Sequence, residues 1–129
     1  MLEHPKELSY TTHHTWVRID TESGTATVGV TEDLTEQIGE VLSIDMPMIG
    51  DELDIDTYCI HLHLQTRIHH LRSPMTGRVT EINREVLDNA RLLHVSPYTN
   101  WIYRMEYDDD EEVHLLMSAD QYTRYLDHL

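Results

Sequence analysis

Apolar and polar residues alternate in short runs along the chain, which is typical of β-strands rather than of amphipathic helices. Residues 15–19 and 26–30 flank turn residues at 23–24, and this spacing predicts a β-hairpin. Further strands are expected at 41–46, 78–82 and 101–105, with a loop over 83–89. The pattern therefore predicts a mainly β fold.

Two helical segments interrupt this pattern. Thr31 is a suitable N-cap for a short helix over 32–38. Ser118 and Gln121 form a capping-box pattern that starts a C-terminal helix. The residues expected on the docked face of that helix are Tyr122, Tyr125, Leu126 and Leu129.

Length and charge limit the functions open to this protein. The 129 residues fit one domain spanning 1–129, which we expect to be monomeric. A formal charge of −15 opposes binding to nucleic acid or to an anionic membrane. There is no apolar run typical of a signal peptide or a membrane span, and the lone Cys59 allows no internal disulfide, so a cytoplasmic protein is expected.

Several motifs follow one another in a familiar order. They are His13-His14-Thr15-Trp16-Val17-Arg18, Ala26 to Thr31, Gly39-Glu40-Val41, Gly50-Asp51-Glu52-Leu53, Ser73-Pro74-Met75-Thr76-Gly77 and Pro97-Tyr98. With them the chain resembles the H-protein of the glycine cleavage system from about Tyr10 to Leu129. The resemblance implies a barrel-sandwich hybrid, the lipoyl-domain architecture with short helical decorations, and a carrier protein rather than an enzyme.

The resemblance also implies a lysine that is joined to lipoate at the tip of a β-hairpin. Counted back from Ser73-Pro74, the motif around that lysine falls on residues 63–67, and the lysine position is Thr66. Shifting the alignment by one residue offers Gln65 or Arg67, neither of which can form the amide. Lys6, the only lysine, lies far away in sequence. We therefore expect no lipoate on this chain.

Histidines replace the usual hairpin motif. Alternation over 59–64 places Cys59, His61 and His63 on one face of a strand. With Thr66 at the centre of the turn, His69 lies directly opposite His63, and three imidazoles converge. Such a cluster could bind Zn, Ni, Cu or Co. The alternative is a polar edge hairpin, because a turn shifted by half a residue pairs His63 with Ile68.

Two functions follow from these observations. The first is a non-lipoylated, H-protein-like binding or scaffold protein that docks on glycine cleavage or lipoate-handling enzymes. The second is a metal- or redox-cofactor-binding module that uses His61, His63 and His69. A catalytic role for Cys59 is less well supported than packing, because no orienting group for a neighbouring histidine can be recognised.

Overall fold

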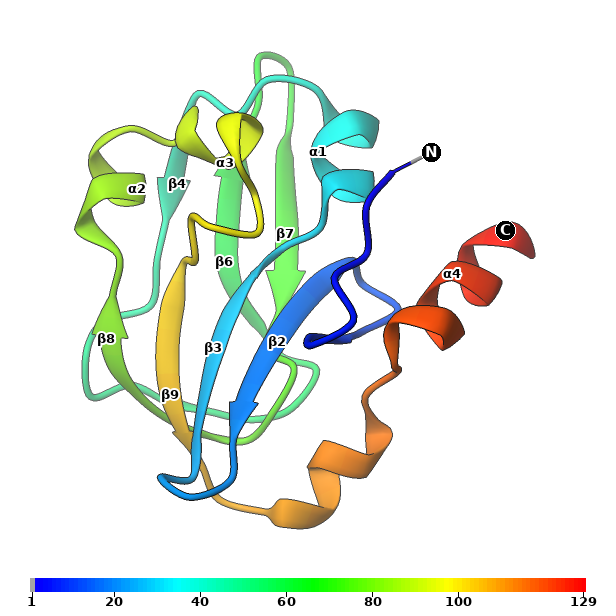
Figure 1. Ribbon diagram of the computed structural model, residues 1–129. Coiled ribbons are helices and arrows are strands. Elements are labelled where there is room, and N and C mark those ends of the chain that lie inside the picture. The colour runs from blue at the N-terminus through cyan, green and yellow to red at the C-terminus, as the bar shows by residue number, and fades with distance from the viewer. Residues whose placement is uncertain (1) are drawn as a thin grey trace.

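The computed structural model describes residues 2–129 and shows two β-sheets packed face to face (Figure 1). The larger sheet has the order β1-β2-β3-β9-β8-β5, and the smaller has the order β4-β6-β7. The strands are β1 (Ser9–Tyr10), β2 (Thr15–Asp20), β3 (Thr25–Val30), β4 (Ser43–Asp45), β5 (Glu52–Leu53), β6 (Tyr58–His63), β7 (Ile68–Arg72), β8 (Gly77–Ile82) and β9 (Tyr103–Tyr107). The mainly β prediction is confirmed.

Short helices decorate the sandwich. They are α1 (Glu32–Ile38), α2 (Arg84–Asp88), α3 (Leu92–Val95), the 3-10 helix η1 (Asp110–Leu115) and α4 (Ala119–Asp127). Figure 1 shows α1, α2 and α3 at the same end of the sandwich as the turn between β6 and β7. None of the helices over residues 2–129 is both long and apolar enough to cross a membrane.

The β2–β3 hairpin follows the predicted register. Its strands pair from Thr15 with Val30 to Asp20 with Thr25. Gly29 of this hairpin has no room for a side chain, because a Cβ built there would lie 2.4 Å from atoms of the Trp16 indole. Glycine therefore allows the indole to lie against the neighbouring strand.

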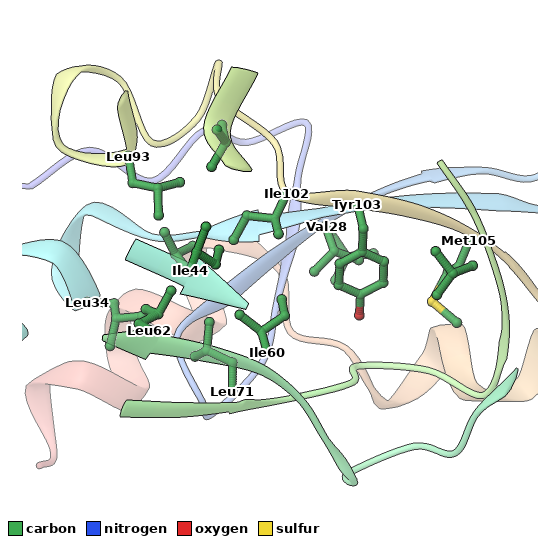
Figure 2. Close-up of a cluster of buried hydrophobic side chains, with 14 of the residues drawn as sticks. Val28, Leu34, Ile44, Ile60, Leu62, Leu71, Leu93, Ile102, Tyr103 and Met105 are labelled. Atoms are coloured by element: carbon green, nitrogen blue, oxygen red, sulfur yellow. The ribbon is translucent and has the colours of Figure 1, made fainter. Parts of the chain in front are cut away.

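The main core lies between the sheets. Ile60, Leu62 and Leu71 point from the smaller sheet toward Val28 and Tyr103 of the larger one (Figure 2). All five side chains are almost completely buried. At about 25 cal/mol per Å² of apolar surface, burial of such side chains is the largest stabilising contribution to this fold.

A second, smaller core joins α4 to the N-terminal strands. Its fully or nearly fully buried members are Leu8, Tyr10, Trp16, Ala119 and Tyr122. The rings of Tyr10 and Tyr122 stack at 4.8 Å between centroids, with an interplanar angle of 3°. Reciprocal backbone hydrogen bonds of 2.8 Å link Tyr10 and Met117.

Helix α4 begins as predicted. The Ser118 side chain accepts from the backbone N–H of Gln121, and the Gln121 side chain accepts from that of Ser118. Of the predicted docked face, Tyr122 is buried, whereas Tyr125 and Leu126 are partly buried against the smaller core. Leu129 follows the helix and is 77% exposed, so its predicted docking is wrong.

Three predicted segments differ from the structure. Residues 83–89 are not a loop, because Asn83 caps α2 by accepting the backbone N–H of Glu85. The strand expected over 41–46 is reduced to β4, with Pro47 soon after it. The strand expected over 101–105 begins two residues later, at Tyr103.

Candidate functional site

The β6–β7 hairpin ends in a tight turn over residues 64–67. The backbone N–H of Leu64 donates to the carbonyl oxygen of Arg67 at 2.9 Å. Gln65 and Thr66 are therefore the two central residues, and both are exposed. The turn presents the Thr66 hydroxyl to solvent at the end of the hairpin.

The hairpin register differs from the predicted one by half a residue at the turn. The structure pairs His61 with His70, Leu62 with His69, and His63 with Ile68. The prediction of His63 opposite His69 is therefore wrong. The physical reason is that the turn is centred between Gln65 and Thr66 rather than on Thr66.

This register separates the histidines that were expected to converge. His69 shares a face with buried Leu62, whereas His61, His63 and His70 lie on the opposite, outer face. Within residues 2–129, no group of three or more His, Cys, Asp or Glu side chains could hold a metal ion. The predicted site of His61, His63 and His69 for Zn, Ni, Cu or Co is therefore not supported.

Asp45 of β4 is the acidic partner of the outer histidines, and sequence reasoning missed it. Strand β4 pairs with β6 so that Asp45 lies opposite His61 and Ser43 opposite His63. The Nε2 atom of His63 lies 2.7 Å from Oδ2 of Asp45, and Nδ1 of His61 lies 3.8 Å from the same oxygen. The hydrogen bond to His63 lowers the pKa of the exposed Asp45 carboxyl.

Aromatic and basic side chains continue this outer face. The rings of His61 and His70 meet edge to face at 4.8 Å, and Tyr58 lies 5.4 Å from His70. The Arg72 guanidinium lies over the Tyr58 ring, 5.1 Å from its centroid. Tyr58 is 60% exposed and Ile68 is 46% exposed. Aromatic and arginine side chains of this kind are enriched in protein interfaces.

Cys59 does not share the outer face with His61, because the register shifts between Tyr58 and Ile60. Its Sγ lies 3.7 Å from the hydroxyl of buried Tyr103 and packs against the main core. Burial raises the pKa of the Cys59 thiol to about 11. The thiolate is therefore scarce at neutral pH, and packing rather than nucleophilic chemistry accounts for this residue.

Comparison with known proteins identifies the family of this chain. The sequence model described as Glycine cleavage H-protein matches residues 8–129. The chain belongs to the glycine cleavage H-protein family. Membership in this H-protein family indicates a carrier type of protein rather than a catalyst.

The chain is similar to individual H-proteins over most of their length. The chain is 34% identical to the glycine cleavage system H protein of Staphylococcus epidermidis over 124 residues, which are 95% of this chain and 96% of the relative. It is 32% identical to that of Halothermothrix orenii, with 95% of each chain covered. The crystal structure of the H protein from Mycobacterium marinum shares the fold with a TM-score of 0.84, at 23% identity, covering 95% of this chain and 98% of that one.

Proposed function

We propose that this chain is a non-lipoylated member of the H-protein family that docks on a glycine cleavage or lipoate-handling enzyme without carrying the group. The observation that carries the proposal is Thr66 at the exposed tip of the β6–β7 hairpin. A threonine hydroxyl lacks the primary amine that forms the lipoyl amide. Neither Gln65 nor Arg67, its neighbours in the turn, supplies one.

Lys6 does not replace the missing lysine. It is exposed and lies in a turn before β1, at the edge of the larger sheet. The hairpin belongs to the smaller sheet. A ligase that recognises a lysine on a hairpin tip finds no amine there in this chain.

The outer face of the hairpin supports a docking role. It combines the exposed Tyr58 and Ile68 with Arg72, and none of residues 57–72 is acidic. Acidic residues number 24 in the whole chain, and Asp45, on the neighbouring β4, is the acidic residue that pairs with the histidines of this face. We propose that the docking domain spans residues 1–129 and acts in the cytoplasm.

Co-expression with lipoyl ligase in the presence of lipoate tests the missing modification. The intact mass of the wild-type protein should stay unmodified, whereas Thr66→Lys should gain one lipoyl group. Gln65→Lys is the matched control, because it offers the same amine one residue away and should be modified less. A lipoyl group mapped to any hairpin residue of the wild-type chain would overturn the non-carrier proposal.

Competition tests the docking role. Added wild-type protein should slow a glycine cleavage reaction that is reconstituted with a lipoylated H-protein. Tyr58→Ala combined with Ile68→Ala should weaken that inhibition, because both side chains are exposed on the proposed docking face. Val95→Ala with Leu115→Ala is the control, since both are also exposed but lie outside the hairpin. Absence of inhibition at saturating protein would contradict docking on the glycine cleavage enzymes.

A further inference from the structure

A cleft of about 310 Å³ opens where the free edge of β7 faces the loop between β1 and β2. His13 and His14 come from that loop, and His69, His70 and Arg72 come from β7. Tyr58 of β6 closes one side. No aspartate or glutamate lines the cleft, although the chain carries 24 of them.

The polar groups of the cleft are largely unpaired within the described chain. The rings of His13, His69 and His70 make no hydrogen bond to residues 2–129. His14 uses Nδ1 on the Tyr122 hydroxyl at 2.8 Å, which leaves its Nε2 without a partner there. These nitrogen atoms are therefore available to a ligand.

Arg72 is held in place at this cleft without being neutralised. Its Nη2 donates to the Tyr58 hydroxyl at 3.4 Å, and its guanidinium lies over the same ring. Arg91 and Arg104 each pair with a glutamate, whereas Arg72 has no carboxylate partner among residues 2–129. A guanidinium keeps several donors free when one of its N–H groups is engaged.

We propose that this cleft is a binding site for a small oxyanion, a carboxylate or a phosphoryl or sulfuryl group, held by Arg72 together with His69, His70 and the His13–His14 pair. The donors and positive charges suit an oxyanion, which accepts several charge-assisted hydrogen bonds at once. A metal cation is disfavoured, because Arg72 repels it. The site shares Tyr58 and Arg72 with the proposed docking face, but oxyanion binding requires neither docking nor lipoylation.

The negative net charge of the protein does not prevent this binding. Charges beyond about 8 Å are largely screened at physiological ionic strength, so the groups that line the cleft dominate the local field. Asp33 is the nearby acidic group that acts on His14 and raises its pKa, but burial has the larger effect and lowers it overall. His13 adds to that lowering.

The surroundings of His69 disfavour its protonated form. Burial lowers the pKa of His69, and the neighbouring Arg67, His14 and His70 lower it further. A bound oxyanion opposes this repulsion and favours the imidazolium form. Binding should therefore take up protons and become tighter as the pH falls through the histidine range.

Sulfate and oxalate are suitable probes, because both keep their double charge from about pH 6 to pH 8, where histidine titrates. We expect calorimetric titration at constant ionic strength to show one site, bound at least about tenfold more tightly at pH 6 than at pH 8. Backbone NMR shifts should change at His13, His14 and residues 69–72. The probe that binds more tightly indicates the natural type of ligand: sulfate stands for a tetrahedral oxyanion and oxalate for a planar carboxylate.

His69→Gln combined with Arg72→Gln should weaken binding of the preferred probe at least tenfold. The matched control is Arg124→Gln with His128→Gln, which removes the same two residue types from exposed positions at α4. Circular dichroism checks that each variant is folded, and His70→Gln, at an exposed position, gives a second and milder change. Equal weakening in the control, or NMR shifts in wild type that avoid the cleft, would overturn the site, as would no binding of either probe at pH 6.

Discussion

Leu62 and His69 lie directly opposite each other across the β6–β7 hairpin. Leu62 is a core residue, whereas His69 lines a cleft at the sheet edge. Their pairing fixes which histidines point outward, and it explains why the expected metal cluster does not form. The hairpin register therefore determines which face of the smaller sheet each histidine occupies.

Engineered cysteine pairs test that register in a Cys59→Ser background. His61→Cys with His70→Cys should form a disulfide readily, because these residues are a directly opposed pair. Alternation from the hydrogen-bonded pair at 64 and 67 makes it a non-hydrogen-bonded pair, with Cα atoms about 4.5 Å apart. Thiol titration and intact mass under mild oxidation measure the outcome.

The matched control joins two positions that are opposed only if the turn is centred on Thr66. His63→Cys with His69→Cys also replaces two histidines, but the two side chains then lie on opposite faces of the hairpin. We expect free thiols in this variant. Faster crosslinking of the 63–69 pair than of the 61–70 pair would show that the hairpin is centred on Thr66 in solution.

Tyr122 should contribute to stability through its hydroxyl as well as its ring. The hydroxyl lies 2.9 Å from Oγ1 of Thr31 and 2.8 Å from Nδ1 of His14, and the residue is fully buried. Tyr122→Phe should cost roughly 1–3 kcal/mol, because a buried partner then loses its hydrogen bond. Tyr125→Phe, at a partly buried position on the same helix, should cost less than about 0.5 kcal/mol in urea unfolding.

A steric prediction concerns Gly29. A Cβ at this position meets the Trp16 indole at 2.4 Å, so Gly29→Ala should destabilise the protein by roughly 1–3 kcal/mol or more. Trp16→Leu removes the atoms in conflict, and the cost of Gly29→Ala should shrink in that background. Additive costs in a double-mutant cycle would show that the close approach is not the cause.

The histidines of the cleft predict a direction for the pH dependence of stability. Burial lowers the pKa of His14 and His69 in the folded state, so between that pKa and about 6.5 the unfolded chain binds more protons. The free energy of unfolding should therefore fall as the pH drops from 7 through this window. His69→Gln should make the fall shallower in buffers that contain only chloride.

A control for this effect uses His128, which is exposed after α4. His128→Gln removes an exposed imidazole that lies outside the cleft, and the fall in this variant should be steeper than in His69→Gln. Urea unfolding at several pH values gives the slopes. A steeper fall in His69→Gln than in wild type would contradict the assigned sign.

Local patterns predicted much of this fold. Alternation found the β2–β3 hairpin, and the Thr31 and Ser118 caps located both predicted helices, because each signal depends on neighbours in sequence. The hairpin site was harder to predict. A half-residue difference in where a turn is centred reverses which residue faces the core, and no residue in Gln65–Thr66 dictates that centre.

Asp45 and the cleft show a second reason why the sequence pattern did not predict the site. Asp45 meets His63 only because β4 pairs with β6, a contact across 18 residues of sequence. The cleft joins His13 and His14 to His69 across more than fifty residues. Such contacts depend on how sheets associate, which the pattern within one strand does not specify.

The hydrogen bonds between Tyr10 and Met117 have a consequence for biosynthesis. During translation, β1 and the Tyr10 ring emerge first, yet Met117 and the stacking partner Tyr122 emerge more than a hundred residues later. The sandwich core between the sheets can form before then, but the smaller core cannot. A nascent chain that stalls before residue 117 therefore keeps Leu8, Tyr10 and Trp16 accessible to chaperones and proteases.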